Sequence, residues 1–257
     1  MRIDRVLAPN PGPFTGPGTN TWVVGDDVEV VVLDPGPVEA SHERSILDVV
    51  GDRSVTAVVV THTHPDHAPL ANPLARVLSV PALGHAPGPE FEPDDRLRDG
   101  DVVRVGGHAL EVVHTPGHSD DHCCFRAGDV LFTGDHIKGG SSVMVDDMTA
   151  YLRSLERVAD LSLRRLLPGH GEEIDRPSEV ISWYLAHRRE RERQIVAAVR
   201  DGAATIGAVV EQVYEDVDRA LHPLAARSVA AHLRKLDAEG VVSLSGSGWD
   251  SRVEVNG

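Results

Sequence analysis

The sequence predicts an α/β fold in two parts, in which two antiparallel-rich sheets covered by helices precede a small winged-helix-like domain. Up to Gly171, short β-branched runs alternate with turns and with single helical segments. After Gly171 the pattern changes to helices and ends in one hairpin. A chain of 257 residues is long enough for one large domain and a small addition. We therefore place the first domain at residues 1–175 and the second at residues 176–257.

The elements of the first domain follow from local patterns. Two β-branched runs at residues 21–24 and 28–33 flank a Gly-Asp-Asp turn, which predicts a hairpin. Apolar spacing predicts helices at residues 41–50 and 149–159, and the almost continuous apolar run at residues 55–61 is typical of a strand buried on both faces. Further strand signals lie at residues 101–105, 110–114, 123–125, 130–132 and 166–167. This mixture of hairpins and single helices favours antiparallel-rich sheets over a doubly wound parallel sheet.

The second domain has the order of elements found in a winged helix, a fold that often binds DNA. Helices are predicted at residues 177–200, 205–214 and 224–239, with Gly240 closing the last one, and a hairpin at residues 241–255 follows. Residues 171–257 carry 11 Lys and Arg against 15 Asp and Glu, so this segment would repel a phosphate backbone. We therefore expect a packing or lid role and no stable DNA binding.

Composition excludes several classes of protein. The chain has 25 Lys and Arg against 40 Asp and Glu, a net charge of -15 that disfavours a non-specific nucleic-acid coat protein. Adjacent residues of a strand point to opposite faces, so Cys123 and Cys124 do not suit a disulfide, and a disulfide scaffold is excluded. No apolar run is long enough for a signal peptide or a membrane span. These observations predict a cytoplasmic, reduced protein that does not bind membranes.

The most specific chemical signal is the segment THTHPDH at residues 61–67, directly after a predicted buried strand. His62 and His64 are two positions apart, so in an extended segment both side chains point to one side and can bind one ion. Asp66 and His67 lie beyond a proline bend and can turn toward a neighbouring ion. Structural zinc sites use mainly Cys, and the two cysteines lack Cys-x-x-Cys spacing. The segment therefore predicts a metal site with a chemical role.

Three further residues complete the set of candidate ligands. His118, Asp135 and His170 each follow a strand-like run and lie in a turn that contains Gly. Glycine lets the backbone turn sharply while the neighbouring ligand faces a shared centre.

This ligand series, in this order, resembles the metallo-β-lactamase superfamily of binuclear-metal hydrolases from about Asn20 to Gly171. The resemblance implies an αββα sandwich with two metals at one edge. It assigns the first zinc to His62, His64 and His118, the second to Asp66, His67 and His170, and a bridging role to Asp135. Two dications about 3.5–4 Å apart can share a hydroxide that is a nucleophile at neutral pH. We expect two Zn²⁺, with Mn²⁺ or Fe as alternatives, because availability helps to decide the metal.

Within the superfamily, zinc β-lactamases place a Cys where Asp135 stands, so antibiotic hydrolysis is not the expected role. The chain resembles more closely the β-lactamase-like protein two family, which includes a single-strand endoribonuclease. The matching stretches are residues 10–13, 18–21, 117–122, 167–171 and 187–195. His136 and Lys138 depart from that family's pattern. The resemblance implies the winged-helix-like domain found above from pattern alone, and it allows a homodimer through the C-terminal helices.

Four residues are candidates for catalysis or substrate binding. Asp66 has a spare oxygen that can orient the attacking hydroxide. His122, four residues beyond His118, either supports the ligands or protonates the leaving group. Lys138 is a basic group near the metals that can contact phosphate, and Phe14 can line an apolar groove. Basic residues at positions 188, 189, 191 and 193 are further RNA contacts or, alternatively, a solvated helix surface paired with the neighbouring glutamates.

The sequence therefore predicts a binuclear zinc-dependent hydrolase, and three functions remain open. The first is a phosphodiesterase or endoribonuclease that acts on single-stranded RNA. The second is a thioesterase or other acyl hydrolase with glyoxalase II-like chemistry, acting on a small-molecule ester or thioester. The third is a metal-binding module without catalytic activity.

Overall fold

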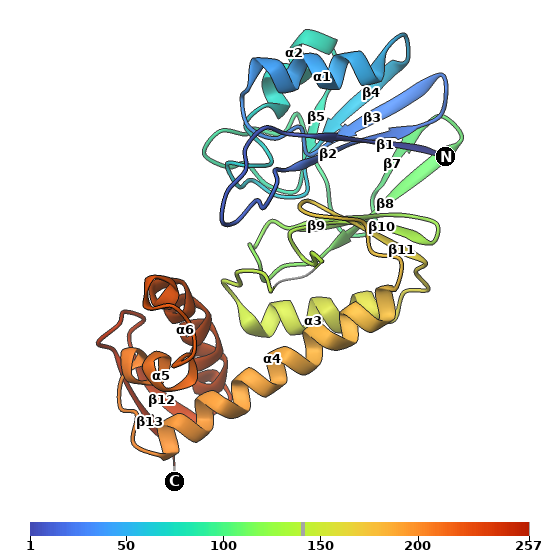
Figure 1. The fold of residues 1–257 in the computed structure, drawn as a ribbon. Helices are drawn as coiled ribbons and strands as arrows, with labels where there is room; N and C mark the ends of the chain where they lie inside the picture. The colour runs from blue at the N-terminus through green and yellow to red at the C-terminus, as the bar shows by residue number, and fades with distance from the viewer. Residues whose placement is uncertain (140–141, 257) are drawn as a thin grey trace. The chain divides into compact units, whose positions relative to one another are not determined.

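The chain forms two compact units in the computed structural model, which describes residues 1–139 and 142–256 (Figure 1). The first unit comprises Met1–Pro116, Asp120–Val143 and Asp160–Val180, and the other described residues form the second. The units alternate along the sequence, so the boundary between residues 175 and 176 stays a prediction. Among the described residues, no helix is long and apolar enough to cross a membrane.

The first unit contains a six-stranded mixed sheet whose strands lie in sequence order. The first three strands pair antiparallel, and the last three pair parallel to their predecessors. The expectation of an antiparallel-rich sheet is wrong here, because helical crossovers between strands three, four and five allow parallel pairing. The strands are β1 (Arg2–Leu7), β2 (Asn20–Gly25), β3 (Glu29–Leu33), β4 (Ser54–Val59), β5 (Ala82–Gly84) and β6 (Asp95–Arg96).

The second sheet of this unit has five strands in the order β11-β10-β9-β8-β7. Its pairs are antiparallel except for the parallel pair of β10 and β11, so here the antiparallel expectation is confirmed. The strands are β7 (Val102–Val105), β8 (His108–His114), β9 (Cys123–Ala127), β10 (Val130–Gly134) and β11 (Arg165–Pro168).

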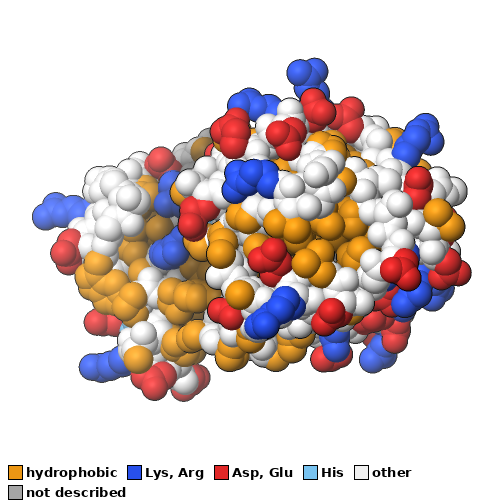
Figure 2. All heavy atoms as spheres, turned by 90° about the horizontal axis from the view of Figure 1, so that it is seen from above, with side chains coloured by type: hydrophobic (Ala, Val, Ile, Leu, Met, Phe, Trp, Pro, Cys, Tyr) orange, Lys and Arg blue, Asp and Glu red, His pale blue; other side chains and the backbone are white. Residues whose placement is uncertain are grey.

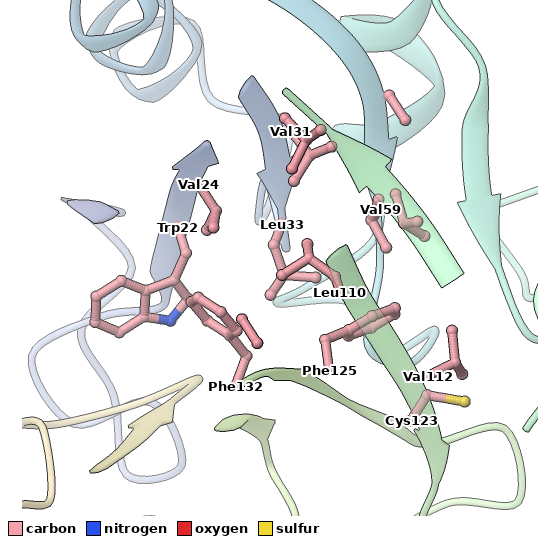
Figure 3. Close-up of a cluster of buried hydrophobic side chains, with 14 of the residues drawn as sticks. Trp22, Val24, Val31, Leu33, Val59, Leu110, Val112, Cys123, Phe125 and Phe132 are labelled. Atoms are coloured by element: carbon pink, nitrogen blue, oxygen red, sulfur yellow. The ribbon is translucent and has the colours of Figure 1, made fainter. Parts of the chain in front are cut away.

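A hydrophobic core lies between the two sheets (Figure 3). Trp22 and Leu33 from the first sheet face Leu110, Phe125 and Phe132 from the second, and all five side chains are buried. The rings of Trp22 and Phe132 meet edge to face, with centroids 6.0 Å apart. Burial of large side chains of this kind stabilises the fold by about 1.5–3 kcal/mol each. This core holds the strand ends of both sheets in fixed positions, and those ends carry the candidate ligands.

Two helices cover the outer face of the first sheet (Figure 1). Ile46 of α1 (Ala40–Val50) and Leu74 of α2 (Ala71–Leu78) belong to a second buried cluster with Val32 and Val58. Val58 and its neighbour Val59 thus face opposite sides of the sheet, each into a buried cluster. This burial of both faces explains the continuous apolar run predicted to be a doubly buried strand.

The second unit is mainly helical and ends in a two-stranded sheet. Its core includes Ile195, Val209, Leu233 and Val253. Gly240, with a φ of 72°, follows the last helix as predicted. The elements are α3 (Met148–Ala159), most of α4 (Pro177–Arg200), α5 (Ile206–Val213), the 3-10 helix η1 (Arg219–Leu221), α6 (His222–Ala238), β12 (Val242–Ser245) and β13 (Arg252–Val255).

Candidate metal centre

The predicted ligands lie in loops that follow the carboxyl ends of strands. Residues 62–67 come after β4, Asp135 directly after β10, and His170 after β11. The two sheets thus contribute to one edge of the first unit, where four of these side chains converge. These loops carry polar side chains, whereas the strands that support them are buried.

Asp66, His67, Asp135 and His170 form one compact group of ligand atoms, all within 4.8 Å of one another. The Nε2 atom of His170 lies 3.1 Å from Oδ2 of Asp66, 3.2 Å from Oδ1 of Asp135 and 3.2 Å from Nε2 of His67. The Nε2 atom of His67 lies 3.4 Å from Oδ1 of Asp135 and 3.8 Å from Oδ2 of Asp66. This second ligand group contains Asp66, His67 and His170, which the resemblance assigns to the second zinc. It also contains Asp135, to which the resemblance assigns the bridging role.

These distances fit a divalent cation. A tetrahedral ion with nitrogen and oxygen ligands at about 2.0–2.2 Å holds neighbouring ligand atoms about 3.3–3.6 Å apart. The five distances of this group scatter around that range, and the group consists of imidazole and carboxylate, the ligand types that zinc, manganese and iron accept. The residues present therefore suit the metal that the sequence predicts.

Three of the predicted ligand histidines bind an acceptor outside the ligand atoms through Nδ1. His67 donates from Nδ1 to Oδ2 of Asp34 at 2.9 Å, and His170 donates from Nδ1 to the carbonyl oxygen of Gly18 at 3.2 Å. His118 donates in the same way to the carbonyl oxygen of Met144 at 2.8 Å. A proton fixed on Nδ1 leaves the lone pair on Nε2, so these rings are prepared to bind a cation.

Asp34 supports this arrangement from the end of β3. Its side chain accepts three hydrogen bonds, from the backbone N–H and the hydroxyl of Thr61 and from the ring of His67. Its φ of 51° is unusual for a residue other than glycine, and such conformations concentrate at functional sites. Because the Thr61 hydroxyl donates to Asp34, it accepts from Nδ1 of His62 at 2.9 Å and leaves Nε2 of that ring as the ligand atom.

His62 and His64, two of the residues that the resemblance assigns to the first zinc, lie together in the first unit. Nε2 of His62 lies 2.9 Å from Nδ1 of His64. His118, the third residue of that assignment, belongs to the segment Gly117–Ser119 of the second unit.

The close packing of His67 and Asp135 requires a glycine at position 169. A Cβ atom on Gly169 would lie 2.6 Å from Cε1 of His67 and 3.1 Å from Oδ1 of Asp135. Real Cβ atoms do not approach other atoms so closely, so any side chain at this position would displace two ligands. The Gly residue next to His170, which the sequence offered as a turn signal, therefore also makes room for the ligand group.

The charges of the second ligand group depend on one another. Burial alone would raise the pKa of Asp66, but the hydrogen bond from His170 and the charge of His67 lower it to about 2. Burial also opposes ionisation of Asp135, yet His67 and His170 hold the pKa of its carboxyl well below the usual value. Burial would lower the pKa of His67, but Asp34 and Asp135 raise it well above the usual value. Both carboxylates are therefore ionised, and a bound cation would replace the proton on the imidazoles.

Lys138 contacts the loop of Phe14, and these two residues are called the rim below. Lys138 donates from Nζ to the carbonyl oxygen of Phe14 at 3.0 Å, and the Phe14 side chain is half exposed. The loop of Phe14 is held by reciprocal hydrogen bonds between Asn10 and Thr19, and its Gly18 carbonyl accepts from His170. The proline- and glycine-rich segment before β2 is thus an ordered loop that contacts a ligand.

Other predicted residues are not among the grouped ligand atoms. His122 is buried, and its ring contacts Thr115 and the backbone of Asp135. On α4, Arg188 is buried over the ring of Tyr151. The residues that sequence reasoning missed are supports: Thr61 behind His62, and Thr115 behind His122. A threonine directly before the first histidine was the available signal for Thr61, but none marked Thr115.

Comparisons with known proteins decide the family. The family described as the metallo-beta-lactamase superfamily matches residues 14–170. A protein of Caenorhabditis elegans named beta-lactamase-like protein 2 homolog is 31% identical over 252 residues, which cover 93% of this chain and 85% of that protein. The chain belongs to the metallo-beta-lactamase superfamily. Members of this superfamily are metal-dependent hydrolases that typically bind divalent metals, and this chain is such a hydrolase.

Further matches extend this result to the second domain and show how varied the relatives are. The beta-lactamase associated winged helix domain matches residues 205–249, which confirms the predicted winged helix of this superfamily member. A crystal structure of a metallo-beta-lactamase family protein from Thermus thermophilus has a TM-score of 0.81 at 24% identity, covering 99% of this chain and 98% of that one, and thus has the same fold. A protein of Aspergillus chevalieri named atrochrysone carboxyl ACP thioesterase is 34% identical over 86% of this chain and 78% of its own length.

Proposed function

We propose that this chain is a binuclear zinc-dependent phosphodiesterase that cleaves single-stranded RNA. The observation that carries the proposal is the hydrogen bond from the Lys138 ammonium to the backbone carbonyl of Phe14, whose side chain is half exposed, in a loop tied to His170. Proteins bind single-stranded nucleic acids by combining cationic groups that contact phosphates with aromatic rings that stack on bases. The rim would thus hold one nucleotide beside the metal centre.

The chain's own residues have separate tasks in this reaction. Bound divalent ions would supply Lewis acidity and activate water for attack at neutral pH. Asp34, Gly18 and Met144 orient the ligand histidines through their Nδ1 atoms. Asp66 has the most exposed side chain of the second ligand group, at 25%, so its carboxylate can accept a proton from the attacking water.

Charge elsewhere supports recognition at the rim rather than along an extended surface. Arg189 pairs with Glu156 at 3.0 Å and Arg193 pairs with Glu190, while Arg188 is buried, so these arginines of α4 fit the solvated and packed alternative. The face shown in Figure 2 mixes acidic and basic side chains. With a net charge of -15, long-range attraction of RNA is weak. We therefore expect short single strands to be bound locally, with a low dependence on salt.

The experiment is cleavage of an end-labelled single-stranded RNA by zinc-loaded protein. Asp135→Ala should lose zinc and turnover, and the double variant Asp66→Asn with His118→Ala excludes a contaminating nuclease. Lys138→Ala should raise KM for RNA with little change in kcat, whereas Lys138→Arg keeps the charge and should remain close to wild type. Fully metallated protein that leaves the RNA intact would overturn the proposal.

A thioesterase is the second candidate, and the similarity to the Aspergillus chevalieri protein named as a thioesterase, at 34% identity, favours it. An exposed aromatic side chain such as Phe14 also suits an acyl chain. The same variants separate the two functions, because a neutral thioester does not need the Lys138 charge. Thioester hydrolysis that persists in Lys138→Ala, with RNA left intact, would select this alternative.

A further inference from the structure

His122 connects two loops of the metal centre through both nitrogens of its ring. Nδ1 lies 2.9 Å from the hydroxyl of Thr115, and Nε2 accepts a hydrogen bond of 3.1 Å from the backbone N–H of Asp135. The ring is fully buried just before β9, while Asp135 follows β10. Thr115 begins the turn that leads to His118. His122 therefore connects the residue that begins this turn with the backbone of Asp135, and it is not itself one of the grouped ligand residues.

The partners of the ring determine where its proton is. A backbone N–H only donates, so Nε2 of His122 accepts and carries no proton. The ring then holds its proton on Nδ1 and donates to the Thr115 hydroxyl, which donates onward to the sulfur of Cys124 at 3.3 Å. A group that protonates a leaving group must present a proton toward the substrate. Nε2 of His122 instead accepts the hydrogen bond from the Asp135 N–H and has no proton to give.

The backbone at Gly134 is shaped for this contact. Gly134 has a φ of 46°, and a Cβ atom there would lie 2.7 Å from Nε2 of His122 and 2.7 Å from the hydroxyl oxygen of Thr61. Only glycine adopts this conformation with so close an approach of the imidazole to the chain. The contact between the ring and the Asp135 backbone is therefore a built feature of the site.

We propose that His122 is a positioning residue, which fixes the backbone of Asp135 so that its carboxylate is held among the metal ligands, and that it does not transfer a proton to the leaving group. The proposal rests on the metal-dependent hydrolysis of the proposed function, but it does not depend on which substrate is cleaved. Loss of an oriented support behind a ligand typically costs about 10–100-fold in metal affinity or activity.

Two conservative variants separate the two ring nitrogens. The side-chain amide of Gln reaches the place of Nε2 and can accept from the Asp135 N–H, whereas the amide of Asn reaches only the place of Nδ1. We expect His122→Asn to weaken zinc binding by about 10–100-fold and His122→Gln to restore most of it. Zinc affinity is measured by competition with a chelating dye and needs no substrate, so failure of the RNA assay would leave this result readable.

Activity on two substrates with different leaving groups tests whether His122 is a general acid. A phosphodiester with a nitrophenolate leaving group needs no general acid, whereas one with an alkoxide leaving group does. We expect each zinc-saturated variant to lose the same fraction of kcat on both substrates. Normal zinc affinity in both variants, with kcat lost only on the alkoxide substrate, would establish His122 as an acid and overturn the proposal. Equal loss of zinc in both variants would also overturn it, because acceptance at Nε2 would then not matter.

Variants of Thr115 keep the test informative if the His122 variants do not fold. Thr115→Val removes the acceptor of the Nδ1 proton, and Thr115→Ser retains it. We expect weaker zinc binding in Thr115→Val and near wild-type binding in Thr115→Ser, with far-UV circular dichroism as the check on folding. Wild-type zinc affinity in a folded Thr115→Val would count against the positioning role.

Discussion

Asp34 shows how much of the metal centre depends on a residue that binds no metal. It accepts hydrogen bonds from Thr61 and from the ring of His67, and so orients one ligand directly and His62 through Thr61. We expect Asp34→Asn to reduce zinc affinity by about 10–100-fold, because an amide in its place accepts with only one of its two groups. Competitive zinc titration measures the change. Asp129→Asn, at an exposed carboxylate paired with Arg164, is the matched control and should bind zinc as the wild type does.

Residue types and spacing made the ligands predictable, but not what lies behind them. The sequence marks residues 62–67 because three imidazoles and a carboxylate within six residues have no ordinary structural purpose. The acceptors of His118 and His170 are backbone carbonyls of Met144 and Gly18, and a carbonyl leaves no trace in residue identity. The metal roles of the ligands themselves stay predictions until an ion is bound and measured.

Among the helices and strands, the local sequence pattern predicts long elements with continuous periodicity. It does not predict short strands that depend on pairing with other strands. Helix α4 was predicted with the bounds that it has, from residue 177 to residue 200. Helix α2 is absent from the sequence prediction, and it contains Pro73 in its first turn, where proline is tolerated. Strands β5 and β6 have three and two residues and exist only through parallel pairing with neighbours distant in sequence. No short-range pattern predicts such pairing.

Helix α5 offers a test of stability at the level of an element. Thr205 caps its N-terminus, with the hydroxyl accepting from the backbone N–H of Ala208 at 3.1 Å. We expect Thr205→Ala to lower the free energy of unfolding of the winged helix by about 1 kcal/mol, because a helix N–H loses its acceptor. Thr205→Ser retains the acceptor and should cost far less. Urea unfolding followed by circular dichroism compares the two variants, and equal losses would rule out the cap as the cause.

For the molecule as a whole, metal binding should be a major source of stability. Four ligands from three loops meet only in the folded chain, so an ion that binds them stabilises the folded state alone. We expect zinc to raise the melting temperature of the wild type and a chelator to reverse the increase. Differential scanning calorimetry of Asp135→Ala provides the contrast. A zinc-induced increase as large as that of the wild type would argue against Asp135 as a ligand.

Stability should also fall in mild acid because of His232 in α6. The ring is fully buried, with Nδ1 3.6 Å from Oε2 of Glu192, and burial lowers the pKa of His232 with help from the charge of Arg188. The unfolded chain then takes up the proton more readily than the folded one. The stability from this group is therefore complete above the usual histidine pKa and is lost as the pH falls below it. We expect His232→Leu to flatten the change in unfolding free energy between about pH 7.5 and pH 5.5, while His108→Gln keeps the wild-type slope.

The two adjacent cysteines of β9 can report how often this strand is transiently exposed to solvent. Cys123 packs in the core between the sheets and Cys124 receives the hydrogen bond from Thr115, and both thiols are buried. A thiol reagent can react with either of them only while the strand is transiently exposed, so the alkylation rate measures how often this part of the molecule opens. Mass spectrometry can measure the alkylation rate of both thiols in the native protein at increasing zinc concentrations. This rate would show whether zinc suppresses local unfolding beside the metal centre.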